Sequence, residues 1–68
     1  MDQLLTPQEA AERLGTSLRF VRRLVFQRRI PYVKVGRHVR IATSDLDAFI
    51  AAGRVDVDEL PAMARKGA

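Results

Sequence analysis

Arginine is the residue type in this sequence whose number and spacing could do chemistry. Residues 13–40 hold nine arginine and lysine residues and no acidic residue, although the net charge of the 68-residue chain is only +4. A basic block inside a folded domain suggests a polyanionic partner. The alternative is a solvated basic face. Like charges three and four residues apart destabilise an isolated helix, however, and a partner that neutralises them is the simpler explanation.

Other kinds of chemistry have little support. The absence of cysteine excludes disulfides and thiolate chemistry, and the single His38 cannot form a metal site on its own. A chain this short forms one domain with too small a core for a deep catalytic pocket. Tyr32 and His38 are isolated, and we find no nucleophile–base pair, carboxylate dyad or glycine-rich phosphate loop. We therefore expect no catalytic residue, no metal, no cofactor and no enzymatic activity.

The sequence also gives an expectation about location. No apolar run approaches the ~20 residues that span a membrane. The N-terminus lacks the basic and then apolar layout of a signal peptide. We expect no membrane association and a cytoplasmic location.

Two short helices position the arginines. Thr6-Pro7-Gln8-Glu9 predicts a helix start, with a capping box between Thr6 and Glu9 and a proline suited to the first turn. Gly15 ends this helix, because glycine accepts the left-handed conformation. The inner face is expected to consist of Ala10, Ala11 and Leu14.

The second helix follows after a tight turn. Ser17 is its expected cap, and the helix runs from Leu18 to about Gln27. Two short helices joined in this way form a helix-turn-helix. At helical spacing the core residues are Leu18, Val21, Leu24 and Val25, whereas Arg19, Arg22, Arg23 and Phe26 fall elsewhere on the helix.

Residues 32–41 predict a β-hairpin around Gly36-Arg37-His38. A two-residue loop of Gly36 and Arg37 suits a glycine-first turn, but it divides the apolar strand residues between two faces. A three-residue loop, Gly36 to His38, puts all of them on one face. Because burial usually fixes register, we expect the three-residue loop. In that register Val35 pairs with Val39 and Val33 with Ile41, while Tyr32, Lys34 and Arg40 point outward.

A third helix is expected from Thr43-Ser44-Asp45 to Gly53, with Ser44 as its cap. Its buried stripe would consist of Leu46, Phe49 and Ile50. We therefore expect a domain at residues 1–53 and a C-terminal tail at residues 54–68. The tail has two interpretations, a short helix that begins near Asp56 or Asp58, or a frayed end.

Four segments together resemble the excisionase-like, MerR-like winged-helix DNA-binding domains. They are Leu-Thr-x-x-Glu-Ala-Ala at residues 5–11, Leu-Gly-x-Ser at 14–17, Ile-Pro-x-x-x-Val-Gly-Arg at 30–37 and Asp-Leu-Asp-Ala-Phe at 45–49. The resemblance covers roughly residues 4–52. It implies an α+β fold that is mainly α, a small winged helix-turn-helix whose second helix is the recognition helix and whose hairpin is the wing.

The resemblance also implies roles for individual residues. The groove-facing residues of the second helix would be Arg19, Phe20, Arg22 and Arg23, and Arg37 at the wing tip would reach the minor groove. Many family members have a glycine where Arg28 or Arg29 stands, so here the helix must end without it. The expected phosphate contacts are Ser17, Arg28, Arg29, Lys34, His38 and Arg40.

A winged helix with only a short tail resembles a phage or prophage excisionase, or recombination directionality factor. Such a protein bends double-stranded DNA near an attachment site, self-associates on tandem sites and helps a phage integrase in a bacterial host, where it is nucleoid-associated when bound. A small transcriptional repressor of the same fold is an alternative. A protein-interaction module that meets an acidic partner is a third interpretation, and a continuous basic stretch suits a duplex better.

Overall fold

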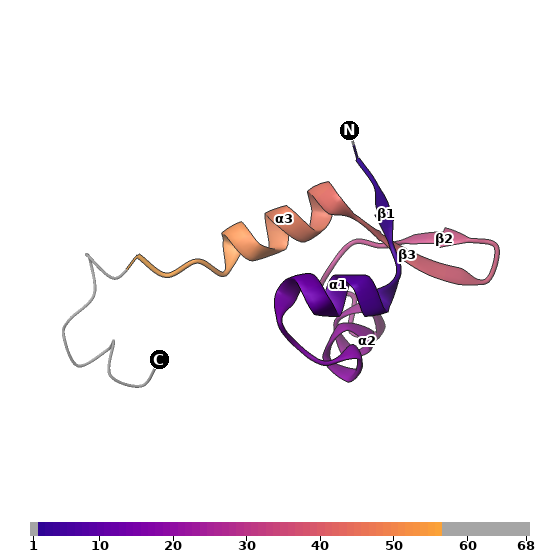
Figure 1. Cartoon of the computed structure of the whole chain (residues 1–68), viewed down its shortest axis with the longest axis horizontal. Helices are drawn as coiled ribbons and strands as arrows, with labels where there is room; N and C mark the ends of the chain where they lie inside the picture. Colours follow the sequence, from indigo (N-terminus) through magenta and orange to yellow (C-terminus); the bar gives the residue numbers. More distant parts are fainter. Residues whose placement is uncertain (1, 57–68) are drawn as a thin grey trace.

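The computed structural model describes residues 2–56, which form three helices and three strands (Figure 1). Helices α1 and α2 pack together, and the β-hairpin and α3 extend from them to opposite sides (Figure 1). This arrangement confirms the predicted α+β fold of a winged helix-turn-helix. In chain order the elements are β1 (Leu4–Leu5), α1 (Pro7–Leu14), α2 (Leu18–Phe26), β2 (Val33–Val35), β3 (His38–Ala42) and α3 (Thr43–Ala52).

The capping box at the start of α1 is confirmed. The Glu9 amide donates to the Thr6 hydroxyl at 3.0 Å, and the Thr6 amide donates to the Glu9 carboxylate at 2.8 Å. This hydrogen bond from the Thr6 amide is the main reason that the pKa of Glu9 is lowered, and the nearby charges of Arg13 and Arg40 contribute less. Two backbone amides at the helix start, those of Thr6 and Glu9, thus each donate to the side chain of the other residue.

Helix α2 begins as predicted and ends without glycine. The Ser17 hydroxyl accepts from the Phe20 amide at 3.1 Å, which caps the first turn. At the other end Arg28 adopts the left-handed conformation with φ 57°. The Arg28 amide donates to the Val25 carbonyl at 3.0 Å, and the Arg29 amide to the Leu24 carbonyl at 2.8 Å. These two bonds form the Schellman motif, which usually has glycine at the left-handed position.

One apolar core joins every element except β2. Ala10 and Ala11 of α1 are fully buried, which lets α2 approach closely with its own buried residues Val21 and Leu24. Ile30, in the segment between α2 and β2, is 2% exposed and belongs to the same core, a contribution that we did not predict. The remaining buried members are Leu5, Ile41 and Leu46.

The sheet has a third strand that sequence reasoning missed. Strand β3 lies between β1 and β2 and is antiparallel to both. Leu4 and Leu5, expected to be a lead-in, form β1 and pair with Ala42 and Ile41. Strand β1 ties the beginning of the chain to the hairpin, so the wing is anchored through β3.

The predicted hairpin register is wrong. The loop contains two residues, Gly36 and Arg37, and Val35 lies opposite His38. Gly36 has φ 64°, which suits a turn with glycine at its first loop position. Every residue of β2 is exposed, so burial does not constrain its register and the turn decides it. The other pairs are Lys34 with Val39 and Val33 with Arg40.

Three side chains differ from the expected orientation. Tyr32, expected to point outward, is half-buried and packs against the core. Arg40 is also half-buried, and its guanidinium donates to the Val39 carbonyl at 2.8 Å. Ile50, expected in the buried stripe of α3, is 47% exposed, because α3 extends away from the helix pair and buries Leu46 most fully (Figure 1).

The predicted cap of α3 is also wrong. The helix begins at Thr43 and its N-cap residue makes no side-chain hydrogen bond. Instead the Asp2 carboxylate accepts from the Ser44 amide at 2.8 Å, from the Ser44 hydroxyl at 2.7 Å and from the Thr43 hydroxyl at 2.8 Å. The hydrogen bond from the Ser44 side chain is the largest cause of the lowered pKa of Asp2. A residue 42 positions away therefore stabilises the helix start.

The last described residues, 53–56, follow α3 without helix or strand. The expected C-terminal helix falls almost entirely on residues 57–68, which lie outside the described residues. Among the helices of residues 2–56, none has the length and apolar character to cross a membrane.

Candidate nucleic-acid interface

Helix α2 has two faces of opposite character. Its core face buries Val21 and Leu24, with Val25 half-buried beside them. The opposite face consists of residues at positions i, i+3, i+4 and i+7, which lie on one side of an α-helix. We call this set the α2 outer stripe. Its members, all exposed, are Arg19, Arg22, Arg23 and Phe26.

The three stripe arginines are those that sequence reasoning assigned to the major groove, but the aromatic member differs. Phe20 is 37% exposed and lies at the edge of the helix between the two faces. Phe26 is 87% exposed and lies within the stripe. Helical spacing had already separated Phe26 and the three arginines from the core residues, but sequence reasoning assigned Phe26 no contact with DNA.

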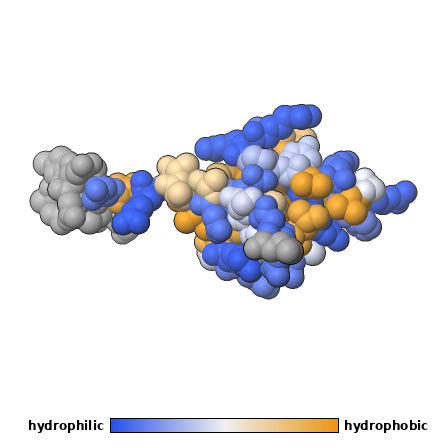
Figure 2. All heavy atoms as spheres, turned by 90° about the horizontal axis from the view of Figure 1, so that it is seen from above, coloured by the Kyte–Doolittle hydropathy of each residue, from blue (hydrophilic) through white to orange (hydrophobic). Residues whose placement is uncertain are grey.

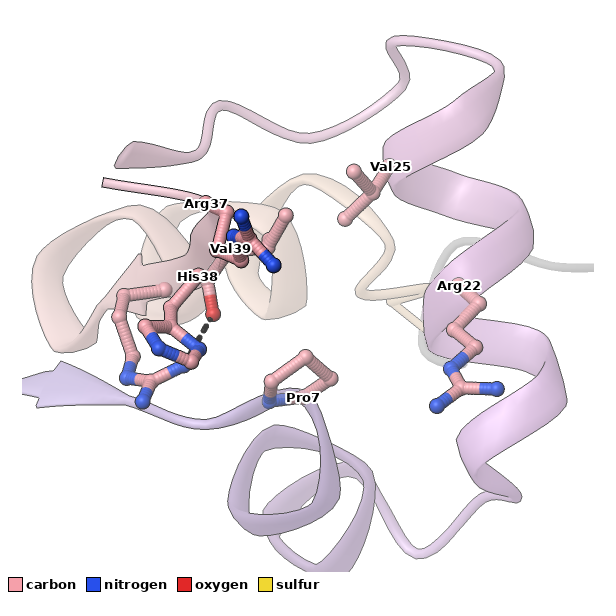
Figure 3. A pocket seen from close by; sticks show the side chains of 7 residues that line it. Pro7, Arg22, Val25, Arg37, His38 and Val39 are labelled. Atoms are coloured by element: carbon pink, nitrogen blue, oxygen red, sulfur yellow. Dashed lines mark hydrogen bonds between the residues drawn. The ribbon is translucent and has the colours of Figure 1, made fainter. Parts of the chain in front are cut away.

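A basic cavity separates α2 from the hairpin. It has a volume of about 280 Å³ and lies between α2 and β3, with Pro7 of α1 between them (Figure 3). Arg22 lines it from α2, and Arg37 and His38 line it from the hairpin (Figure 3). The cavity lining carries three arginines and a histidine and no acidic residue. The complete lining is Pro7, Arg22, Val25, Arg37, His38, Val39 and Arg40.

The residues expected to contact phosphate do not form one cluster. His38 and Arg40 line this cavity, whereas Arg28 and Arg29 line a second hollow. The side chains of the expected phosphate contacts are exposed with the exception of Arg40, which is half-buried. The Ser17 hydroxyl oxygen accepts the cap bond of α2, so its proton can still be donated to a ligand. Arg28 and Arg29 lie at the C-terminal end of α2, Lys34 lies opposite Val39 in the hairpin, and His38 begins β3.

Acidic residues lie on other elements. Glu9 and Glu12 are on α1, and Asp45 and Asp47 are on α3. The cavity brings α2 and the hairpin together in one basic region, where an anion meets no carboxylate from the acid-free segment itself. Within residues 2–56, no group of three or more histidine or acidic side chains could hold a metal ion.

Some apolar side chains are exposed on the hairpin and at the N-terminus. Figure 2 shows one face of the molecule, on which hydrophobic side chains reach the surface among more numerous hydrophilic ones. Leu4, Val33 and Val35 are between 40% and 49% exposed. They are smaller and less exposed than Phe26, which is the most exposed large hydrophobic residue of the described chain.

A family model described as a helix-turn-helix domain matches residues 4–54. The chain belongs to this helix-turn-helix family. The match begins at β1 and ends just after α3, so it covers both helices of the motif, the hairpin and α3. Family membership indicates DNA binding, and such domains are typically not enzymes. A search of curated proteins and a search of solved structures find no match.

Proposed function

We propose that this helix-turn-helix domain binds double-stranded DNA with α2 in the major groove and the hairpin against the adjacent backbone. The observation that carries the proposal is the α2 outer stripe, three exposed arginines on one face with no acidic residue in the segment. A helix of this size fits the major groove, and the recognition helix of such motifs contacts base edges there. The basic cavity beside it supports a phosphate contact between helix and wing.

The arginines divide into two roles under this proposal. Arg19 and Arg23 read bases, most naturally guanine, where each bidentate pair contributes ~1–3 kcal/mol of discrimination. Arg22 also lines the cavity, so it can reach either a base or a phosphate. Arg37 at the wing tip enters the minor groove, where a narrow A-tract favours a cation. The basic side chains at the end of α2 and in the hairpin neutralise phosphates, which fixes the register of the protein on the DNA and makes binding depend on salt.

The biological role that we propose is that of an excisionase, a recombination directionality factor. Its support is the sequence resemblance of residues 4–52 to excisionase-like winged-helix domains. Several copies bind tandem sites near an attachment site, bend the DNA and help an integrase assemble the excisive complex. Contacts between neighbouring copies are head-to-tail and can extend along the DNA.

A transcriptional repressor of the same fold would use the same α2 surface, and the arrangement of DNA sites separates the two roles. Selection of bound duplexes from a random pool gives the site, and gel-shift titration then gives the number of copies. Direct repeats, stepwise cooperative complexes and bent DNA would support the excisionase, and integrase-dependent excision would test it further. One dimeric complex on an inverted repeat at a promoter would contradict it and favour the repressor.

A further inference from the structure

Phe26 is the apolar member of a face that is otherwise arginine. It follows Arg22 and Arg23 by four and three residues, so its side chain lies over the turn that carries them. Single exposed hydrophobic residues are common on protein surfaces and by themselves indicate nothing. Phe26 differs because it is in the α2 outer stripe, the surface that we propose enters the DNA.

Within residues 2–56, the packing of the fold makes little use of this ring. Phe26 is 87% exposed and belongs neither to the buried core nor to the half-buried residues packed against it. Leu24, two residues earlier on the same helix, is 2% exposed. A ring that contributes almost nothing to the core keeps nearly all its apolar surface available for a ligand, and covering that surface would be favourable.

The charges around Phe26 select the kind of ligand. Arg22 and Arg23 precede it, Arg28 and Arg29 follow it, and no acidic residue occurs between Arg13 and Ser44. A second copy that used the same face would bring arginines against arginines, which is unfavourable. The ligand must therefore offer negative charge and an apolar group close together.

The major groove of DNA offers both. Phosphates line its edges, and thymine is the base that displays an apolar group there, its C5-methyl. We propose that the Phe26 ring packs on the methyl group of a thymine close to the base pairs that Arg22 and Arg23 contact. This inference rests on the proposed docking of α2, and it adds a specificity-determining residue that sequence reasoning had not assigned.

Replacement of thymine by deoxyuridine tests the contact, because it removes the methyl group and leaves the hydrogen-bonding edge intact. Each thymine of the selected site is replaced singly, and affinity is measured for the wild-type protein, Phe26→Ala, Phe26→Leu and Ile50→Ala. Ile50 is a matched control, since it is an exposed apolar residue on α3, outside the stripe. Thermal unfolding by circular dichroism checks that all variants fold.

At one thymine, removing the methyl group should weaken wild-type binding about fourfold, because one buried methyl contributes ~0.8 kcal/mol. Phe26→Ala should lose about fourfold to tenfold in affinity and no longer distinguish thymine from deoxyuridine at that position. Phe26→Leu should retain part of the preference for thymine over deoxyuridine, and Ile50→Ala should retain all of it.

Three results would overturn the inference and leave the proposed function intact. One is specific binding in which no thymine methyl matters, and another is a Phe26→Ala variant that still discriminates as the wild-type protein does. If Phe26→Ala binds single sites normally but loses cooperativity on tandem sites, the ring contacts protein and the inference is also wrong. Failure to select any specific site would overturn the proposed function and this inference together.

Discussion

The two helices of the helix-turn-helix begin and end in the same way but have different outer faces. Each starts with a hydroxyl that caps the amide three residues on, from Thr6 in α1 and Ser17 in α2. Each ends with the same pair of hydrogen bonds around a left-handed residue, Gly15 in α1 and Arg28 in α2. Because the two helices share their capping chemistry, the difference between them lies in their outer faces, where the arginines of α2 are exposed.

The outer faces of the two helices differ in composition. Helix α1 exposes charged residues of both signs, among them Glu12 and Arg13, together with the neutral polar Gln8. The Gln8 side-chain amide donates a hydrogen bond to the Glu12 carboxylate at 3.4 Å, so some polar groups of this face are paired with each other. Helix α2 exposes arginines with no acidic neighbour in its segment, so this face offers its positive charge to an external anion.

The largest expected effect separates the inner and outer faces of α2. Leu24→Ala removes a side chain that is 2% exposed, and we expect it to lower the free energy of unfolding by ~2–4 kcal/mol. Phe26→Ala, on the outer face, should change it by less than ~0.5 kcal/mol. Urea unfolding followed by circular dichroism measures both. Similar losses for the two variants would contradict the assignment of the faces.

The next effect separates α2 from the wing in DNA binding. Arg23→Ala should weaken binding to the selected site by ~1–3 kcal/mol and relax the preference for one base. Arg37→Ala should weaken binding broadly, most at sites with a narrow A-tract, and reduce the salt slope by about one. Fluorescence anisotropy titrations at several salt concentrations, on specific and random duplexes, separate these signatures. If neither variant alters affinity at moderate salt, the proposed docking is wrong.

Substitutions at the left-handed residues that end α1 and α2 should change the stability of the fold in opposite directions. Gly15→Ala should cost ~1 kcal/mol of stability, since a Cβ at φ 67° is strained even though no atom lies within 4 Å of it. Arg28→Gly should stabilise the fold by up to ~1 kcal/mol, because it removes that strain at φ 57°. Chemical unfolding measures both variants. Loss of stability in Arg28→Gly would mean that its side chain supports the fold.

The same Arg28→Gly variant also tests function. If Arg28 contacts phosphate, the more stable variant should bind DNA more weakly at all sequences and with a lower salt slope. Stabilisation with weaker binding would show that arginine is kept at this position for a ligand. Unchanged binding would contradict the predicted phosphate contact of Arg28.

The smallest expected effect is the response to acid. The pKa of Glu9 and of Asp2 is lower in the folded protein, so their stabilisation is complete above about pH 4–5 and is lost as the pH falls through the folded pKa. The loss should come from α1 and α3, since α2 has no acidic residue in its first turn. Melting temperature should be flat from pH 7 to 5 and then fall.

Glu9→Gln should make that fall shallower, because glutamine keeps the hydrogen bond of the capping box without a titrating group. The matched comparison is Glu12→Gln, which removes a carboxylate of α1 outside the capping box. Equal effects of the two substitutions would show that the cap does not cause the acid sensitivity.

Local signals predicted the elements, and distant pairings explain most of the errors. The start of α1, the start of α2 and the buried face of α2 follow from residues within a few positions of one another. The cap of α3 by Asp2 joins residues 42 positions apart, and no local pattern indicates it. Strand β1 is only two residues long, too short to produce an alternation.

The hairpin register failed for a different reason. We assumed that burial decides register, but β2 projects from the core and is exposed throughout. The turn chemistry of Gly36 then outweighs the apolar pattern. In the candidate interface, spacing on α2 identified the arginines correctly as exposed, whereas the cavity between α2 and β3 depends on tertiary packing and could not be predicted.

Methylation interference on the selected DNA site tests the central claim most directly, that α2 arginines read the major groove. Methylation of guanine N7 blocks an acceptor that faces this groove. We predict that it prevents wild-type binding at one or more guanines, and that Arg19→Ala or Arg23→Ala selectively abolishes the interference at its own guanine. Arg13→Ala, the same charge change on α1, should leave the pattern unchanged. Interference at no guanine, or the same pattern in every variant, would contradict the account.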